Sequence, residues 1–425
     1  MFEDRRDIER EVLPNGLVVI TERMPHVRSV SVGIWIRTGS RREPSDLNGI
    51  SHFIEHMVFK GTERRSAEEI AGAVDSVGGM LDAFTAKEMI CFNAKVLDEH
   101  LPIAFDVLAD LVRRPRFAKE DITKEKQVVL EEIKMDQDNP DYLVHEIFTE
   151  SFWPGHALGK PILGTRETVK RFTRESLFAC FRLWYAPNNT VITAAGHIEH
   201  ARMMELVRRE FDELAPGEKD SPEVAPQPQA RITTKTKRGL EQVHICLGVP
   251  SFPVADHRRF ALAVFNNILG GGMASRLFQN IREKQGLAYA VFSDLSPYRD
   301  AGLLSIYAGT ARETVDRLLL SVAEEFRKLK QQPVTNEELR RAKDHLNGSL
   351  VLSLESTNVR TSNLAREEIY FGRFFTVDEI LRATESVTRE QVQEIARELL
   401  RPEQIGVTVL GNLDAWKFTR DQLAC

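Results

Sequence analysis

Two kinds of hydrophobic pattern recur along the chain. Short runs rich in β-branched residues predict strands in the first half, and apolar residues at helical spacing predict helices at 47–60, 66–77 and over much of 98–182. The predicted strands are "GLVVITE" (16–22), "SVSVGIWIR" (29–37), the alternating stretch around 78–96 and "NNTVITAAG" (188–196). Strands grouped with runs of helices favour an α+β architecture.

The same order recurs after residue 231. Strands are predicted at "VHICLGVPS" (243–251), "GLAYAVFSDL" (286–295) and "QIGVTVLG" (404–411), with helices near 256–269, 274–284 and 311–330. "GGMLDAF" (78–84) and "QGLAYAV" (285–291) both follow a pair of predicted helices. We interpret the two halves as a divergent duplication.

A proline-rich segment separates the halves. "APGEKDSPEVAPQPQAR" (215–231) holds four prolines and almost no large apolar residue, which predicts an extended linker. We therefore expect an N-terminal domain at 1–214 and a homologous C-terminal domain at 232–425.

Composition and charge exclude several classes of protein. The net charge of −6 gives no general reason to bind nucleic acid or anionic membrane, and no apolar run is long enough to cross a bilayer. The four cysteines show neither paired nor metal-ligand spacing, so we expect free thiols. The charged start "MFEDRRDIER" lacks the apolar segment of a secretory signal, and we expect a cytoplasmic protein.

The run "HFIEH" (52–56) carries the main candidate chemistry. On a helix each residue advances about 100°, so His52, Glu55 and His56 share one face. Two imidazoles at positions i and i+4 can bind one zinc ion, and the carboxylate beside them can take a proton from an attacking water. The equivalent helix of the second half reads "FALAVFNNILG", so any metal site is confined to the first half.

A second helix offers the third ligand that such a site needs. In "EKQVVLEEIKM" (125–135), Glu125, Val128, Val129 and Glu132 fall on one helical stripe, with both valines expected in a core. Glu125 and Glu132 could be surface residues beside the valines. Next to "HFIEH" we favour Glu132 as a ligand and Glu125 as a carboxylate that orients the site.

These motifs closely resemble the pitrilysin family of inverted zinc peptidases, and most of all bacterial relatives of the mitochondrial processing peptidase catalytic subunit. The resemblance runs from "LPNGLVV" (13–19) through "GISHFIEHMVFKGT" (49–62), "EKQVVLEE" (125–132), "LGKPILGT" (158–165) and "WYAPNNTVITAAG" (184–196) to "LGGGMASRLFQNIREKQGLAYAV" (269–291). In that family the third ligand and a second Glu stand at spacings that match Glu132 and Glu125. The resemblance implies two domains, each an antiparallel sheet packed with helices, that enclose a chamber.

The resemblance also implies substrate contacts. Arg282 and Tyr289 match a pair that holds the substrate carbonyl and stabilises the oxyanion, although a solvated helix residue and an ordinary strand aromatic are the alternatives. Phe53 is expected in the pocket for the side chain after the cleaved bond. Asp82, Ala83 and Phe84 lie in a stretch that resembles the family's substrate-binding edge strand, but relatives carry Asn where this chain has Asp82. Glu88 matches a carboxylate near the ligands.

We therefore expect a zinc metalloendopeptidase with one Zn²⁺ per chain, held by His52, His56 and Glu132, with Glu55 as general base. An acidic run after the ligand helix, at Asp136, Asp138, Asp141 and Glu146, favours basic peptides, although such runs are usually solvated. Two alternatives remain, a non-catalytic scaffold subunit of the same family and a hydrolase of a non-peptide substrate. By resemblance, the protein is expected to be a homodimer.

Overall fold

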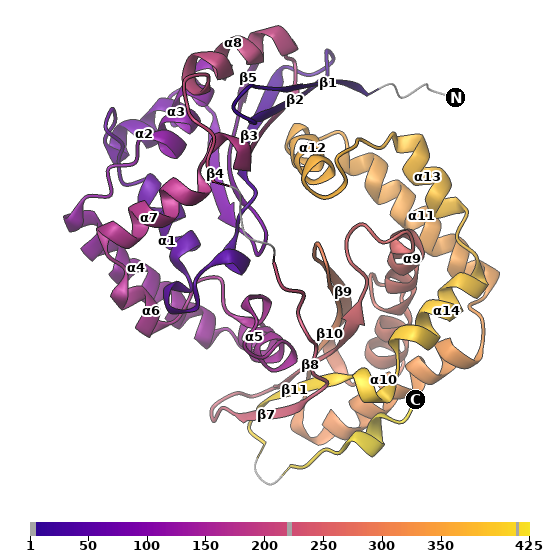
Figure 1. Cartoon of the computed structure of the whole chain (residues 1–425). Helices are drawn as coiled ribbons and strands as arrows, with labels where there is room; N and C mark the ends of the chain where they lie inside the picture. Colours follow the sequence, from indigo (N-terminus) through magenta and orange to yellow (C-terminus); the bar gives the residue numbers. More distant parts are fainter. Residues whose placement is uncertain (1–5, 219–222, 414–415) are drawn as a thin grey trace. The chain divides into compact units, whose positions relative to one another are not determined.

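The computed structural model describes residues 6–218, 223–413 and 416–425, which form two compact units (Figure 1). Unit 1 contains the described residues up to 134, with 161–218, 223 and 352–376; unit 2 contains 135–160, 224–351 and 377–425 without 414–415. Residues 219–222 of the predicted linker lie outside the described residues. The chain thus crosses between the units several times. The predicted domains, in contrast, were each one continuous segment.

Unit 1 is built on a six-stranded sheet whose strands follow the order β1-β2-β6-β3-β5-β4. Only the β2–β6 pair is parallel. The strands are β1 (Asp7–Val12), β2 (Val18–Arg23), β3 (Ser29–Ile36), β4 (Met80–Thr85), β5 (Ile90–Leu97) and β6 (Thr190–Gly196). The helices are α1 (Ile50–Val58), α2 (Ala67–Asp75), α3 (Leu101–Arg113), α4 (Lys119–Asp138), α6 (Arg166–Arg171), α7 (Arg174–Trp184), α8 (His200–Phe211) and α12 (Thr357–Phe371), and the end of α4 belongs to unit 2.

Unit 2 repeats this plan on a five-stranded sheet of order β7-β11-β8-β10-β9, again with one parallel pair, β7–β11. Taken from β2 onward, unit 1 has the same order and the same parallel pair. The strands are β7 (Ile232–Thr236), β8 (Val243–Ser251), β9 (Ala288–Pro297), β10 (Gly302–Thr310) and β11 (Gly406–Gly411). The helices are α5 (Pro140–Phe152), α9 (Arg259–Leu269), α10 (Val315–Gln331), α11 (Asn336–Ser353), α13 (Val377–Glu385) and α14 (Arg389–Leu399), with the end of α11 in unit 1.

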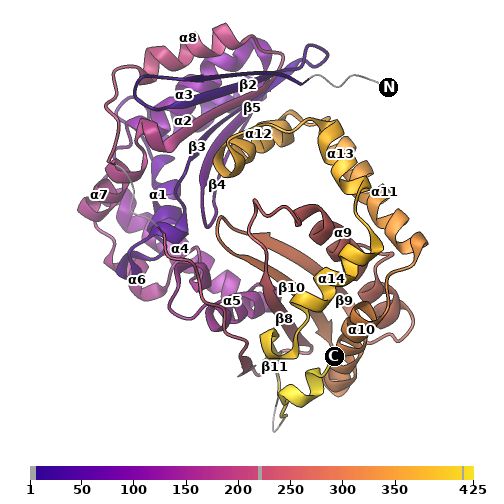
Figure 2. The ribbon, with the colours of Figure 1, turned by 45° about the vertical axis from the view of Figure 1, so that its right-hand side comes forward.

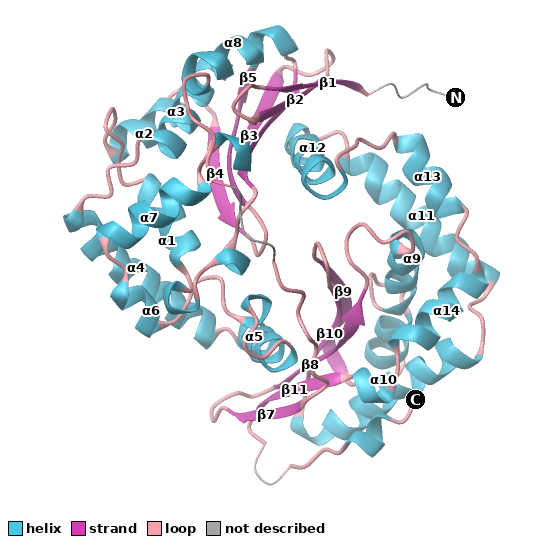
Figure 3. Ribbon diagram, viewed as in Figure 1, coloured by secondary structure: helices cyan, strands magenta, loops and turns pink. Residues whose placement is uncertain are grey.

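The shared strand order supports the interpretation as a duplication, and the predicted α+β class is confirmed (Figure 3). "GGMLDAF" and "QGLAYAV" lead into β4 and β9, and each of these strands is the last in its sheet. Between 274 and 284 the structure differs in detail from the predicted helix, because Phe278–Glu283 forms a π-helix.

Each sheet receives one helix from the other half of the sequence (Figure 2). Helix α12 covers the face of the first sheet formed by Val18, Ile20 and Trp35, where Leu364 and Ala365 are fully buried. Helix α5 covers β8 and β11 of the second sheet. Helix α5 lies between β5 and β6 in the sequence, and α12 lies at the equivalent place between β10 and β11. Each of these two helices therefore covers the sheet of the other half.

The other face of the first sheet holds the larger core. Val30, Val32 and Ile34 of β3 point into it, together with Phe53 and Met57 of α1. This core fixes α1 against the sheet, next to β4. In the described parts of the chain no helix is long and apolar enough to cross a membrane.

Candidate metal centre

Helix α1 starts at a backbone position that only glycine fits. Gly49 has φ +94°, and a Cβ there would lie 2.5 Å from the Leu163 carbonyl oxygen. Glycine has no side chain that could cap the helix. The Glu43 carboxylate, which lies outside the helix, caps it instead: it accepts hydrogen bonds from the Gly49 and Ser51 amides at 2.7 and 2.8 Å. Burial raises the pKa of Glu43, while these bonds act in the opposite direction. The helix that bears "HFIEH" is therefore anchored at its first turn.

The apolar face of α1 includes Phe53. Its side chain is completely buried, with its ring centroid 5.3 Å from that of Phe172. The expectation that Phe53 lines a substrate pocket is therefore wrong, because a side chain without exposed surface in the core cannot contact a substrate.

Helix α4 presents Glu125 and Glu132 to α1. Val129 is buried as predicted, but Val128 is 49% exposed, so the expected four-residue stripe is wrong at that position. Leu130 and Ile133 are buried instead, which rotates the buried face of α4 away from Val128. Both carboxylates still point toward the histidines.

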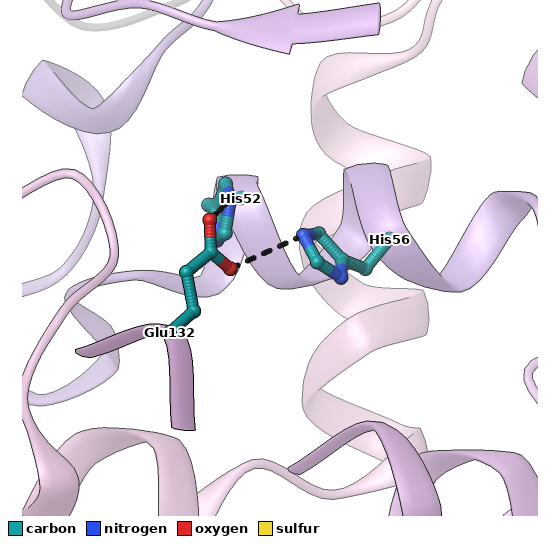
Figure 4. A group of neighbouring side chains, drawn as sticks. All are labelled: His52, His56 and Glu132. Atoms are coloured by element: carbon teal, nitrogen blue, oxygen red, sulfur yellow. Dashed lines mark ion pairs between the residues drawn. The ribbon is translucent and has the colours of Figure 1, made fainter. Parts of the chain in front are cut away.

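The three predicted ligands meet, as Figure 4 shows. Glu132 Oε1 lies 3.8 Å from His52 Nε2, and Glu132 Oε2 lies 3.6 Å from His56 Nε2. Two ligand atoms at about 2.1 Å from a tetrahedral zinc ion are about 3.4 Å apart, so the residues fit such an ion. In the part of the chain that the structure describes, no other group of three His, Cys, Asp or Glu has this proximity.

The protonation of His52 suits metal binding. Burial, together with the charge of His56, lowers the pKa of His52 to about 3. The imidazole is therefore neutral near pH 7, which is the form that binds a metal.

Glu125 connects the site to a lysine. It is buried and accepts hydrogen bonds from His56 Nδ1 at 2.8 Å and from Lys60 Nζ at 2.9 Å. Burial alone would raise the pKa of Glu125, but the bonds from His56 and Lys60 lower it. A carboxylate on Nδ1 leaves Nε2 of His56 free for an ion, as is usual behind histidine ligands.

Glu55 is held by the edge strand. Thr85, the last residue of β4, donates a hydrogen bond from Oγ1 to Glu55 Oε2 at 2.5 Å. The pKa of Glu55 is raised, chiefly by burial and also by the nearby carboxylates of Glu132 and Asp82, against the effects of Thr85 and His56. A raised pKa suits a carboxylate that must accept and release a proton near neutral pH.

The predicted substrate strand is β4, which among the described residues pairs only with β5. Ala83 is partly buried, whereas Asp82 and Phe84 are exposed, and the Phe84 ring lies edge-on to Trp35 at 5.9 Å. A terminal strand can pair with an added chain. Glu88 is buried and accepts hydrogen bonds from Arg41 and from the Tyr370 hydroxyl, and its place near the ligands stays a prediction.

Arg282 and Tyr289 belong to unit 2 and lie close to each other. The Arg282 guanidinium carbon lies 5.0 Å from the centre of the Tyr289 ring and 4.7 Å from that of Phe278. Tyr289 is 77% exposed on β9, so it is not a core aromatic. The π-helix that carries Arg282 is a rare element, frequent at functional sites.

Sequence reasoning missed three residues of the site. Lys60 follows His56 by four positions, so helical spacing could have identified it. The pairing of Thr85 with Glu55 and of Glu43 with the α1 amides depends on tertiary contacts, which no local pattern encodes.

Comparisons with known proteins show the family to which the chain is similar. Residues 18–166 match the model of the insulinase family (peptidase family M16), and residues 171–346 match that of the peptidase M16 inactive domain. The chain is 43% identical to an uncharacterized zinc protease of Bacillus subtilis, YmxG, over 92% of this chain and 95% of that protein. It is 40% identical to an uncharacterized zinc protease of Streptomyces coelicolor, over 96% and 90%.

Two solved structures share the fold. A protease from Helicobacter pylori matches with a TM-score of 0.88 at 21% identity, over 95% of this chain and 99% of that one. A peptidase M16 inactive domain from Pseudomonas fluorescens matches with a TM-score of 0.89 at 21% identity, over 97% and 100%. From the two family models and the relatives of 40% identity or more, the chain belongs to peptidase family M16, the pitrilysin family of zinc proteases.

Proposed function

We propose that the chain is a zinc-dependent endopeptidase with one Zn²⁺ held by His52, His56 and Glu132. The observation that carries the proposal is the convergence of these ligand atoms beside a separate carboxylate, Glu55, fixed by Thr85. Relatives named zinc proteases support the choice of metal.

A zinc ion held by His52, His56 and Glu132 would supply Lewis acidity at this site. The chain's own residues do the rest. Glu55 takes a proton from the attacking water and passes one to the leaving amine. Glu125, paired with Lys60, keeps His56 oriented. The backbone of β4 pairs with an extended substrate, and Arg282 and Tyr289 hold the carbonyl as it becomes an oxyanion.

The proposed substrates are peptides or presequence-like extensions, as for a processing peptidase, and basic ones in particular. Asp82 supports this preference, because it places a negative charge on the strand that would pair with substrate. The proposed assembly is a homodimer.

Cleavage of a quenched fluorescent peptide, rich in Arg, tests the function. The parent protein is compared with Glu55→Gln, which keeps the ligands and removes the base, and with Glu63→Gln as an exposed control. We expect Glu55→Gln to lose at least about a hundredfold in rate with unchanged zinc content, and the control to match the parent. Equal rates for the two variants would overturn the role of Glu55.

A non-catalytic scaffold subunit is the second candidate, favoured by the similarity of residues 171–346 to an inactive domain. That segment does not include His52, His56 or Glu132, so it does not bear on the ligands themselves. A protein that holds zinc at full occupancy but cleaves no peptide would support the scaffold role.

A further inference from the structure

A groove runs between α2 and β4 in unit 1, with a volume of about 690 Å³. Its apolar lining includes Phe59, Ile70, Val74 and Leu81, and Ile70 and Val74 are almost completely buried beneath it. Two acidic residues with exposed side chains, Asp75 and Asp82, also line the groove. The volume lies in the range of known ligand sites, about 300–1,000 Å³.

The groove lies at the start of β4, and the last residue of this strand contacts the proposed base. Side chains alternate across a strand, so Leu81, Ala83 and Thr85 share the helix-covered face of the first sheet. Thr85 contacts Glu55, and Leu81 lies in the groove. These two residues are four positions apart, which corresponds to about 13 Å along a strand. A peptide paired with β4 would therefore place a side chain in the groove a few residues from the bond next to Glu55.

Gly72 provides a second observation. It lies inside α2 and lines the groove, and a Cβ there would have no atom within 4 Å. A glycine inside a helix costs about 1 kcal/mol relative to alanine, and packing does not require it here. Gly79 differs, because its Cβ would lie 2.7 Å from side-chain atoms of Val74 and Val96. The missing side chain at Gly72 leaves the groove open.

We propose that this groove is a substrate subsite for a large apolar side chain, two to five residues from the scissile bond on one side. The inference rests on the proposed peptidase function. The apolar floor fits an aliphatic or aromatic side chain, and the exposed Asp75 fits a basic residue beside it in the same peptide.

A filling variant tests the subsite without weakening the fold. Gly72→Leu replaces a helix glycine with a strong helix former and places a side chain at the groove. Gly348→Leu is the matched control, since Gly348 is an exposed glycine inside α11 whose Cβ would also have no atom within 4 Å. The substrates are quenched peptides of one sequence, with a single Leu or Ala at each position from two to five residues before or after the cleaved bond. Mass spectrometry verifies the cleavage site.

We expect the parent and Gly348→Leu to cleave one Leu peptide with a kcat/KM about tenfold above its Ala counterpart. In Gly72→Leu, kcat/KM for that Leu peptide should fall to the value for its Ala counterpart, so that the preference is lost. Cleavage by the parent without preference, or a preference that persists in Gly72→Leu, overturns the subsite alone. Absence of cleavage of every peptide overturns the peptidase function, and the subsite with it.

Discussion

At the scale of single residues, the site depends on pairs that keep its charges oriented. His56 is held by Glu125, and Glu125 by Lys60, in one chain of hydrogen-bonded charges. Glu125 is buried, so its carboxylate has lost hydration, and the ion pair with Lys60 compensates for this loss at its second oxygen. Lys60 would therefore affect a bound metal only through two other side chains.

Replacing Lys60 tests this chain of contacts. Lys60→Met keeps the length of the side chain and removes its charge, and we expect zinc affinity to fall about 10- to 100-fold, as for other residues behind metal ligands. Competition with a chromophoric chelator measures the dissociation constant. Lys134→Met, which removes a lysine paired with the exposed Glu131, should leave the affinity unchanged. Equal affinities in the two variants would contradict the role of Lys60.

Residue spacing predicted the grouping of the site well, because His52, Glu55 and His56 lie on one helix and helical geometry is local. The contribution of Glu132 followed from the need for a third ligand and from the resemblance. Val128 was misplaced because burial depends on how a helix is rotated against its neighbours, which a single helix does not reveal. The pocket role of Phe53 had come from the resemblance alone.

At the scale of elements, α1 depends on a cap from outside the helix. Glu43→Ala removes the acceptor of two amide hydrogen bonds, and we expect the free energy of unfolding to fall by about 1–2 kcal/mol. Zinc affinity should fall as well, because the first turn of α1 carries His52. Urea unfolding and chelator competition measure the two effects. Glu63→Ala, at an exposed position, is the control, and a loss of the same size there would contradict the capping role.

The contact of α5 with the second sheet contains one partly buried histidine, His145, and one buried histidine, His244. In His145 of α5, Nδ1 lies 3.5 Å from Cys246 Sγ, and the ring stacks on Tyr307. Burial lowers the pKa of His145 below its usual 6.5, although the carboxylates of Asp141 and Asp294 act in the opposite direction. Burial also lowers the pKa of His244, whose Nδ1 lies 3.0 Å from Asp141.

A lowered histidine pKa makes unit 2 sensitive to acid. Below pH 6.5 the unfolded chain binds protons that the folded chain excludes, so the free energy of unfolding should decrease as the pH falls. In His145→Gln the free energy of unfolding should change less with pH, by up to about 1.4 kcal/mol per pH unit. Urea unfolding between pH 8 and 5 measures this slope. His257→Gln, at a side chain that is 88% exposed, should keep the parent slope. An unchanged slope in His145→Gln would contradict the assignment.

At the scale of the whole molecule, the sequence predicted the duplication but not the exchange of α5 and α12. Repeated strand patterns are visible in a single sequence, and the shared strand order supports them. Which sheet an amphipathic helix covers is decided by complementary side chains far apart in sequence. For α12 these include Glu367 with Arg6 and Glu368 with Arg10.

Because α12 comes from the second half of the sequence, we expect the first half by itself to lack part of its fold. A fragment of residues 1–231 lacks α12 and leaves the face formed by Val18, Ile20 and Trp35 uncovered. We expect it to bind the dye ANS and to associate. The same fragment, joined by a flexible linker to residues 352–376, should bind less dye and stay monomeric. Equal dye binding and equal mass for the two proteins would show that α12 is not needed.

The late position of α12 in the sequence also affects synthesis. Residues 197–356 separate the end of β6 from the start of α12. At about 5–20 residues per second, a ribosome needs roughly 10 to 30 seconds to make them. During that time the first sheet is complete but one of its apolar faces has no partner. The nascent chain therefore offers a binding surface to ribosome-associated chaperones, and slow translation across this interval should increase its aggregation.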